Sequence, residues 1–530
     1  MHWKRYKALP VTEKYDETYY IIGLDIGNDS TGIAFYNLYE NTPEPIDPSG
    51  GYGKPTIPTV MQYIAETKEW VFGEYAILNQ GAGTEVTLQS LVRRLGSFDY
   101  LEIDGKSVSV VSVLGMFIRE LLASVRNINP RAEIVGIVAA VSAYLSEAAH
   151  EDLLRAFKLA GYEKELIALV PDRECILAHH FQFAGPEPGP ELGPGDENVL
   201  LLDFGSREVR GGVYAARRNK DISVKSLSSL FDESIGTEKI DKDIYALFES
   251  YYHKGHGSAT EAHHPQQVGE QLTAFAYQHK DILFQKNIRA KPAKLYFNFV
   301  YPPFQQTITH ADAEDLIKPY HRRFNRFIRD TLEKTLNESP RAKFLSPRDI
   351  GTVICIGGGF EMLWAREAVA AMFSPSQTRM YKNAKLVTAE GAALVAARML
   401  DVTKGYNICV EDNHQLPADI GLSTGEAFLP LVQLGAFWWQ KHPSTLVLVN
   451  NPVDGELRLN LAERTATGEA RQLITHNLTG LPARPKGTTR LKFGVNFNSN
   501  TDLTLSVEDL GFGELFPKTD YAQEIAVRLG

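Results

Sequence analysis

The sequence predicts an α/β domain of two lobes, followed by a smaller domain built of β-strands. Two segments, near residues 20–36 and 198–215, share one pattern and indicate two related halves. Strands and helices alternate up to about residue 402, which is typical of an α/β layer fold. After about residue 415 strand patterns dominate, and the 530 residues exceed what one hydrophobic core usually serves.

The two repeated segments are predicted hairpins. In the first, an apolar run ends in Asp25, one hydrophobic residue and Gly27, and the second repeats this with Asp203 and Gly205. Each continues as another apolar stretch after a few polar residues, as expected for strand, turn and strand. A carboxylate at the end of a buried strand, followed by glycine, suits phosphate held by turn N–H groups with a hydrated metal nearby. The pattern therefore predicts one nucleotide held by both hairpins.

The first half also carries clear helix and strand signals. The spacing of apolar residues predicts a helix over 110–125, a strand over 134–140 and a helix over 148–159 that Gly161 ends. The segment 183–196 is too rich in proline and glycine for regular structure. We expect it to be a surface loop between the two lobes.

The second half continues the alternation of helices and strands. Helices are predicted around 241–251 and 320–336, a buried strand over 352–356 that runs into three glycines, and further helices from 361 and over 388–399. In the C-terminal part, alternation of apolar and polar residues predicts strands over 446–449, 457–461, 491–497 and 503–507. This change of pattern predicts a separate β-domain of about 100 residues.

Composition excludes several classes of protein. The chain has 55 basic and 65 acidic residues, a net charge of −10, and no long Lys/Arg run, so we expect no nucleic-acid partner. Cys175, Cys355 and Cys409 are far apart, which disfavours a disulfide framework or a zinc cluster and favours a reducing, cytoplasmic location. No apolar stretch has the length of a signal or a membrane span, so no membrane association is expected.

The order of motifs resembles the actin-like ATPase superfamily, whose fold is ribonuclease H-like. The motifs are Asp25-Ile-Gly27, Asp172, Asp203-Phe-Gly205 and Gly357-Gly358, in the positions of the first phosphate, connecting, second phosphate and adenosine motifs. Their spacing favours the 70-kDa heat-shock chaperone branch. Segments 419–424, 428–432, 476–487 and 491–508 resemble the substrate-binding β-sandwich of that family.

The resemblance implies an arrangement of domains. It consists of an actin-like nucleotide-binding domain (1–402, with lobe I at about 18–183 and lobe II at about 197–402), a linker (403–415), a substrate-binding-like β-sandwich (416–516) and a C-terminal tail (517–530). Only about fifteen residues follow the sandwich, so we expect no helical lid. The stretch that matches the family's apolar linker is Val410-Glu-Asp-Asn413, and a polar linker gains less burial on docking.

The resemblance also implies roles for particular residues. Asp25 and Asp203 would orient Mg²⁺ through water, and Asp172, where the family carries Glu, would position the attacking water. The implied ATP- or ADP-binding residues are Gly27, Asn28, Asp29, Ser30, Gly205, Ser206, Arg207, Gly236, Lys280, Gly357, Gly358 and Gly359. The implied substrate-binding residues are Leu422, Thr424, Phe428, Leu448 and Leu457, although all of these except Thr424 are more safely described as β-core. Such a site works mainly by positioning and charge neutralisation.

The second phosphate motif departs from the family. It reads Gly205-Ser-Arg-Glu-Val-Arg210, with Glu208 in place of a threonine and Arg210 where another catalytic Asp is expected. A carboxylate beside the γ-phosphate repels it unless Arg207 or Arg210 compensates. We therefore expect nucleotide binding rather than rapid hydrolysis.

Two hypotheses of different class follow. The first is an ATP-binding, chaperone-like protein with Mg²⁺ as cofactor, slow hydrolysis, and a β-sandwich that binds a polypeptide client or a protein partner. The alternative is a catalytically degenerate nucleotide-binding scaffold or regulatory protein that docks one dedicated partner. A small-molecule kinase of the same superfamily is disfavoured, because the β-sandwich has no role in one and no acceptor pocket is readable.

Overall fold

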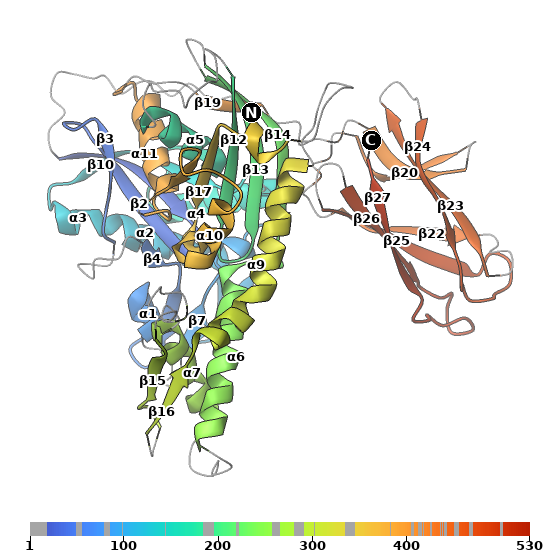
Figure 1. Cartoon of the computed structure of the whole chain (residues 1–530), viewed down its shortest axis with the longest axis horizontal. Coiled ribbons are helices and arrows are strands. Elements are labelled where there is room, and N and C mark those ends of the chain that lie inside the picture. Colours follow the sequence, from blue (N-terminus) through green and yellow to red (C-terminus); the bar gives the residue numbers. More distant parts are fainter. Residues whose placement is uncertain are drawn as a thin grey trace. The chain divides into compact units, whose positions relative to one another are not determined.

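The protein is described from a computed structural model. It describes residues 18–529 except for 49–55, 79–84, 98, 144, 184–195, 219–221, 257–264, 280–282, 284–290, 301–302, 334–344, 382, 404–407, 412–415, 417, 425–426, 435, 437, 439–441, 450–454, 466–469 and 499–501. These residues form two compact units: residues up to 410 other than 226–231, and residues 226–231 with those from 411 onward (Figure 1). The loop expected over 183–196 lies almost wholly outside the described residues.

Two six-stranded sheets form the frame of the first unit, although one strand of the second sheet includes residues 226–231. The first has the order β11 (Leu166–Pro171), β10 (Glu133–Val141), β1 (Tyr19–Ile26), β2 (Ser30–Asn37) and β3 (Thr42–Pro45), with β4 (Thr56–Pro58) paired to β2. The second has the order β18 (Thr378–Met380), β17 (Thr352–Ile356), β12 (Asp196–Phe204), β13 (Val209–Arg218), β14 (Ile222–Asp232) and β19 (Ile408–Glu411). In both sheets an antiparallel hairpin lies beside two parallel strands, so the halves repeat one topology.

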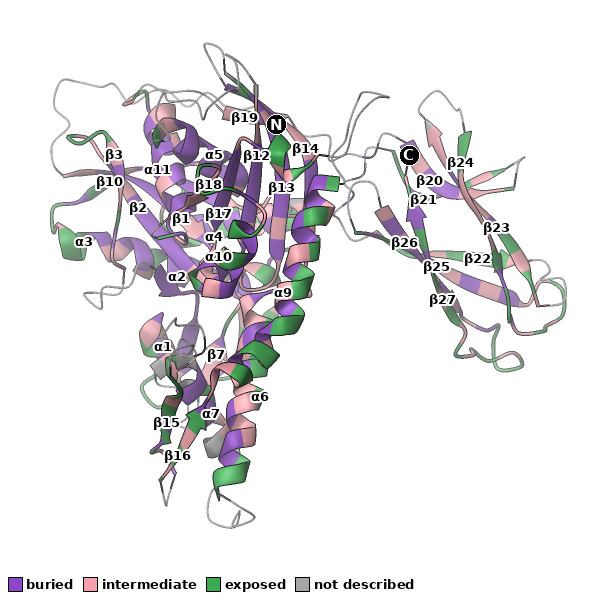
Figure 2. Ribbon diagram, viewed as in Figure 1, coloured by how far each residue is buried: buried purple, intermediate pink, exposed green. Residues whose placement is uncertain are grey.

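The helices of the first unit are mostly amphipathic or buried segments. They are α1 (Glu74–Leu78), α2 (Val110–Ala123), α3 (Val125–Ile128), α4 (Glu147–Ala160), α5 (Asp172–Phe183), α6 (Thr237–His256), α7 (Pro265–His279), α9 (His310–Glu333), α10 (Leu363–Ala370) and α11 (Val387–Met399). Ser146 accepts a hydrogen bond from the Ala149 amide at the start of α4, and Gly161, with φ of 89°, ends it. Figure 2 shows the central strands buried, whereas α9 has an exposed outer side.

Two helices cross over between the halves of this unit. Helix α11 follows the second sheet in sequence but packs on β1, β2 and β10 of the first sheet. Helix α5 follows the first sheet, yet its Ile176, Leu177 and Phe181 pack with buried residues of the second. A Cβ at Gly391 in α11 would lie 2.0 Å from the Cys175 carbonyl oxygen, so only glycine permits this contact between the two helices. The crossing brings the two hairpins to one place.

Smaller sheets extend the first unit. They are β6 (Glu69–Phe72), β5 (Met61–Ile64) and β7 (Glu85–Leu88); β8 (Tyr100–Ile103) and β9 (Lys106–Ser109); and β15 (Ala293–Phe297) and β16 (Phe304–Ile308). Short 3₁₀ turns are Val92–Arg94, Pro347–Asp349 and Gly358–Glu361.

The second unit contains two four-stranded antiparallel sheets. Their orders are β21 (Phe428–Val432), β20 (Ala418–Ser423), β23 (Leu457–Thr465), β24 (Ala470–Leu478), and β22 (Thr445–Val449), β25 (Thr489–Phe497), β26 (Asp502–Asp509), β27 (Ala522–Arg528). Burial alternates strictly along β26, and almost strictly along β25, so each strand has a core face and an outer face.

Most of the expected elements are confirmed. The strand over 352–356 is β17, and the helices expected over 148–159 and 388–399 are α4 and α11. The helix expected from 320 begins at His310, because α9 continues through Pro319.

Two boundaries are corrected by the structure. Residues 517–530, expected as a tail, contain β27, which pairs along its whole length with β26. The expected polar linker over 403–415 contains β19, which joins the edge of the second sheet, and Val410 is buried there among Ile222 and Val224. Residues 408–411 of this stretch therefore belong to a sheet, with Val410 as an apolar contact.

Candidate functional site

The two hairpins place their acidic residues at matching positions. Asp25, at the end of β1, lies opposite Gly32 on β2, and Asp203, at the end of β12, lies opposite Arg210 on β13. Both pairs are seven residues apart in the sequence. The position opposite the acid therefore holds glycine in the first hairpin and arginine in the second.

Both turns close in the same way. The Gly27 amide donates to the Ser30 carbonyl at 3.1 Å, and the Gly205 amide donates to the Glu208 carbonyl at 3.0 Å. In the first turn, the amide oxygen of Asn28 is buried and has no hydrogen-bond partner among the described residues. An unpaired buried polar atom is costly, so this turn has unused capacity to bind a polar group.

Helix α6 begins on the second turn. Gly236 precedes it, and a Cβ there would lie 2.3 Å from the Ser206 carbonyl oxygen, so the close approach requires glycine. The amides of Thr237 and Glu238 donate to the carbonyls of Gly205 and Ser206 at 3.2 and 2.8 Å. These bonds fix the turn to the start of the helix.

The glycine run after β17 lies against Asp203. Gly357 has φ of +88°, and a Cβ there would lie 2.7 Å from an Asp203 carboxylate oxygen and 2.5 Å from the Phe204 carbonyl. Gly359 packs directly on the Phe204 ring, and a Cβ at Gly358 would meet the Lys385 side chain. The glycines thus let the chain pass close to the second hairpin.

Arg210 joins both halves at the site. One guanidinium nitrogen, Nη1, donates to Asp172 Oδ2 at 2.5 Å and to Ser142 Oγ at 3.1 Å, and Nη2 donates to Asp203 Oδ2. Asp172 is the first residue of α5, and its side chain is 13% exposed, so it is no exposed loop acid. Glu208 lies near Arg210 as well, with Nε and Oε1 separated by 3.9 Å.

Asp25, Asp172 and Asp203, here called the acid triad, repel one another through their negative charges. Burial raises the pKa of Asp25 to about 7, and the negative charges of Asp203 and Asp172 contribute to the rise while Arg210 opposes it. Burial also raises the pKa of Asp203, again against the effect of Arg210. The pKa of Glu208 is raised by burial too. Perturbed acids that gather at one place are typical of functional sites.

Magnesium does not fit the triad. Even when bound through water, Mg²⁺ needs carboxylate oxygens as acceptors, and Arg210 already holds one oxygen of Asp172 and one of Asp203. Within the described part of the chain, no group of three or more His, Cys, Asp or Glu side chains could hold a metal ion. We therefore assign no metal to Asp25 and Asp203.

Two further expected nucleotide contacts are Arg207 and Lys280. Arg207 forms an ion pair with Glu233, and its charge also acts on Glu208 of the second turn. Lys280 falls outside the described residues.

The expected substrate-binding residues do not form one surface. Leu422 pairs with the buried Leu461, and Leu457 with the buried Leu478, so both are on the core side of their sheet. Register places Phe428 on the opposite side, where the Arg464 guanidinium lies 4.3 Å from its ring centroid.

The other two residues of this set are exposed. Thr424 lies in the turn between β20 and β21 and accepts a hydrogen bond from the Ala427 amide. Leu448 is on β22, one of the two edge strands of the other sheet, and is 53% exposed, so it is not a core residue.

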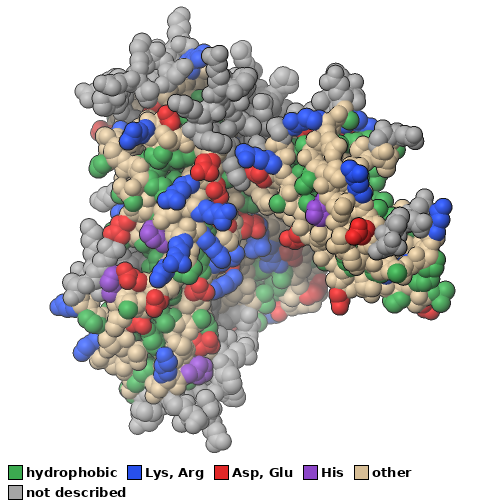
Figure 3. Space-filling view, turned by 45° about the vertical axis from the view of Figure 1, so that its right-hand side comes forward, with side chains coloured by type: hydrophobic (Ala, Val, Ile, Leu, Met, Phe, Trp, Pro, Cys, Tyr) green, Lys and Arg blue, Asp and Glu red, His purple; other side chains and the backbone are tan. Residues whose placement is uncertain are grey.

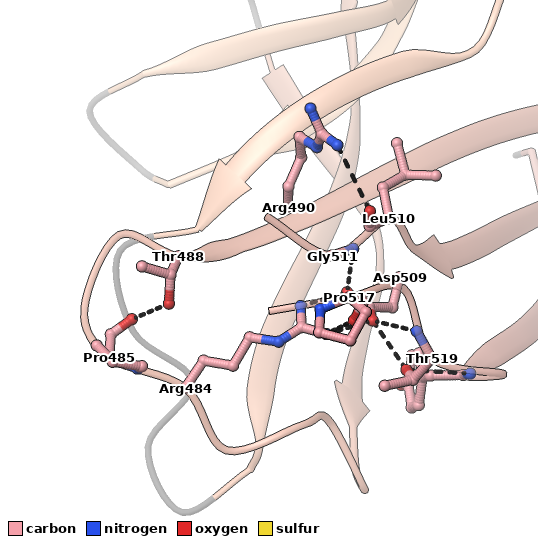
Figure 4. Close-up of polar contacts among 10 residues, drawn as sticks. Arg484, Pro485, Thr488, Arg490, Asp509, Leu510, Gly511, Pro517 and Thr519 are labelled. Carbon is pink, nitrogen blue, oxygen red and sulfur yellow. Dashed lines mark hydrogen bonds and ion pairs between the residues drawn. The ribbon is translucent and has the colours of Figure 1, made fainter. Parts of the chain in front are cut away.

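A buried ion pair in the second unit was not anticipated. Arg484 donates two hydrogen bonds of 2.7 Å to Asp509, whose carboxylate also accepts from the Gly511 amide and from the amide and hydroxyl of Thr519 (Figure 4). Arg484 donates further to the Pro517 carbonyl at 2.8 Å. This Arg484 clamp fixes the loop between β26 and β27. Its signal in the sequence is a single Arg and a single Asp, 25 residues apart.

A basic face was also missed. Figure 3 shows Lys and Arg side chains gathered on the visible face of the first unit, although the chain is acidic overall. Helix α9 contributes exposed Lys318, Arg322, Arg323, Arg326 and Arg329. Their spacing of mostly three to four residues puts them along one side of a helix without forming a run in the sequence.

The fold and the site define a class of protein. A mixed α/β unit with two acidic hairpins, together with a separate unit of antiparallel sheets, is consistent with the two-domain architecture of 70-kDa heat-shock proteins. The chain is 23% identical to "Chaperone protein DnaK" of Thermotoga petrophila and of Thermotoga maritima, over 93% of this chain and 79% of each relative. The corresponding protein of Thermosipho africanus is 22% identical over the same shares. These matches support a distant relationship to that family.

Two family models match parts of the chain. Residues 42–183 match a family of unknown function (DUF5716), C-terminal, and residues 415–529 match a domain of unknown function (DUF8552). The second match includes β27, in agreement with its place in the sheet. Among the helices that the structure describes, none combines the length and the apolar character needed to cross a bilayer.

Proposed function

We propose that this chain is an ATP-binding, chaperone-like protein. In this proposal the turns of the two hairpins hold the phosphates of ATP or ADP, and the second unit, a β-sandwich, binds an unfolded polypeptide or a protein partner. The distant relationship to proteins named chaperone DnaK, over 93% of the chain, supports both parts.

One observation carries the proposal for the nucleotide. Asp203 comes from the second sheet and Asp172 from the end of the first, yet Arg210 binds both, so the ends of the two halves meet at one place. Such a junction between two α/β sheets, at the carboxyl ends of parallel strands, is where ligands of α/β proteins usually bind. The unpaired Asn28 amide oxygen is a further point of attachment for a ligand.

Hydrolysis in this site is slow or absent. Asp172 would have to position a water molecule, but its carboxylate is engaged by a guanidinium. An acid held in an ion pair is a weaker acceptor for that water proton, and the general-base contribution is typically 10²- to 10⁴-fold. We expect single-turnover phosphate release that barely exceeds the uncatalysed background.

The contact of Arg210 with Asp172 also favours a second candidate function. If ATP binding is not followed by hydrolysis, the chain acts as a nucleotide-dependent scaffold that docks one dedicated partner through the second unit. The two functions differ in what is bound: a chaperone takes many unfolded chains and releases them on addition of ATP, whereas a scaffold retains one partner in a fixed ratio whether nucleotide is present or not.

Leu448 is the residue on which we test client binding. It is 53% exposed on the edge strand β22, where an extended peptide could add to the sheet. The probe is a fluorescent, reduced and carboxymethylated polypeptide that cannot fold. We expect Leu448→Asp to weaken its binding at least fivefold, since a charge replaces the apolar contact.

Leu515→Asp is the matched control. Leu515 is 87% exposed in the loop before Phe516, outside the strands, so its variant should bind the probe as the wild type does. Equal weakening by both substitutions would show a non-specific effect of charge. Absence of binding by the wild type would contradict the chaperone function and leave the scaffold.

A further inference from the structure

The position of Arg210 bears on the cofactor of the proposed nucleotide site. In the first hairpin the matched position, opposite Asp25, is Gly32, and a Cβ there would already touch Leu386 and the Lys385 carbonyl at 3.4 Å. In the second hairpin the same position has room for a full arginine, whose guanidinium reaches across to Asp172 and Ser142. Only the second hairpin brings a fixed cation to the junction.

Arg210 fills the coordination space that a divalent cation would need. Its two terminal nitrogens bind oxygens of Asp172 and Asp203, which come from different sheets. A planar guanidinium with donors in a fixed fork binds carboxylates and phosphates in two-point contacts and cannot lose its proton. A cation that requires the same oxygens would meet both a steric obstacle and a like charge.

We infer that Arg210 replaces the divalent cation of this site, so that the chain binds the phosphates of a nucleoside triphosphate without Mg²⁺. This rests on the proposed nucleotide site, and it goes beyond that proposal by removing the metal from it. The guanidinium neutralises part of the acid triad and presents positive charge to the phosphates at a fixed point. The net charge that an incoming phosphate meets is therefore set by the protein, not by the concentration of Mg²⁺.

The test compares ATP binding by the wild-type chain in two buffers. Isothermal titration is carried out with 1 equivalent of chain against ATP, once with excess EDTA and once with excess MgCl₂. We expect dissociation constants that agree within about threefold. A wild-type chain that binds ATP at least tenfold more tightly with Mg²⁺ would overturn the inference while leaving the nucleotide site intact.

Substitution of Arg210 should restore dependence on the metal. Arg210→Ala leaves three acids without this guanidinium, so we expect ATP binding in EDTA to weaken at least tenfold and to recover at least in part with Mg²⁺. The control is Arg464→Ala: Arg464 also pairs with an aspartate, Asp419 at 2.9 Å, but it belongs to the second unit and not to the triad. The control should match the wild type in both buffers, and metal dependence in the control as well would overturn the assignment to Arg210.

A second readout separates this inference from the nucleotide proposal. Mn²⁺, as a paramagnetic substitute for Mg²⁺, is titrated into the nucleotide-free chains and followed by electron paramagnetic resonance. We expect no tight Mn²⁺ site at the triad in the wild type and a gain of one in Arg210→Ala. Tight Mn²⁺ uptake by the wild type that Asp203→Asn abolishes would overturn the inference. If no ATP binds in either buffer, the nucleotide proposal fails. The Mn²⁺ titration then still decides whether Arg210 takes the place of a divalent cation.

Discussion

Two clusters in this chain pair arginine with aspartate, but they shift the pKa of their acids in opposite directions. In the Arg484 clamp, one arginine meets one aspartate, and the side chains are 4% and 0% exposed. In the site of the first unit, one arginine is shared by Asp172 and Asp203 with Asp25 nearby, and the side chains remain 13–24% exposed. The first cluster has balanced charge and full hydrogen bonding, whereas the second has surplus negative charge.

The pKa values follow this difference. Burial alone would raise the pKa of Asp509, but the hydrogen bonds from Arg484, Gly511 and Thr519 outweigh it and hold that pKa well below its usual range. At the site, burial and neighbouring acids raise the pKa of Asp25 to about 7 in spite of Arg210. A balanced cluster stabilises the fold, and an unbalanced one is maintained at the expense of stability, as functional sites often are.

Loss of the Arg484 clamp should have the largest effect on stability. Arg484→Ala leaves the Asp509 carboxylate buried and uncompensated, which typically costs about 3–5 kcal/mol. Hydrogen exchange of the β26 and β27 amides measures this locally, because the clamp holds the loop that joins these strands. Arg464→Ala is the control: Arg464 is 37% exposed and pairs with Asp419, so it should cost less than about 1 kcal/mol. Equal costs would refute a special role for the clamp.

Acidification should weaken the second unit next. Because the folded-state pKa of Asp509 is depressed, its stabilising effect is present above the unfolded pKa of about 3.9 and is lost as pH falls below it. We expect a loss of about 1–2 kcal/mol between pH 6 and pH 3, seen as faster exchange of the β27 amides. In Asp509→Asn this part of the pH dependence should be gone. A pH profile that is unchanged in the variant would contradict the assignment.

The acid triad should show a pH dependence of the opposite sign. The folded-state pKa of Asp25 is raised, so its ionisation destabilises the first unit as pH rises from about 3.9 toward 7. Asp25→Asn removes that cost, and we expect added stability at pH 8, up to about 4 kcal/mol for a pKa shift of this size, and none at pH 4. Thermal unfolding at the two pH values checks this. Destabilisation at pH 8 would mean that Asp25 is a structural acid like Asp509.

The hairpins could be predicted from the sequence because their signal is local. An apolar run that ends in Asp, one hydrophobic residue and Gly determines where the strand ends and the turn begins, and both cases are found as expected. The pairing of Asp203 with Arg210 can also be predicted from the sequence, since their seven-residue spacing equals that of Asp25 and Gly32. Cross-strand partners point to the same face of a sheet, so this spacing places the Arg210 side chain beside Asp203.

Other features depend on contacts between distant segments. The contact of Asp172 with Arg210 requires α5 to lie between the two sheets, and no local pattern shows this. The pairing of β27 with β26 depends on the loop before it, which the Arg484 clamp holds, and the two residues of the clamp carry no periodic signal. The basic side of α9 does not form a run of charges in the sequence, because helical spacing separates its Lys and Arg residues.

Titration of the wild-type chain and of Arg210→Glu with ATP tests the central claim most directly. If the two hairpins hold the phosphates beside Arg210, the wild type binds one ATP per chain and the charge reversal weakens binding at least tenfold, while the fold measured by circular dichroism is unchanged. Absence of heat from the wild type, or equal affinities of the two folded chains, would contradict a nucleotide site at this junction.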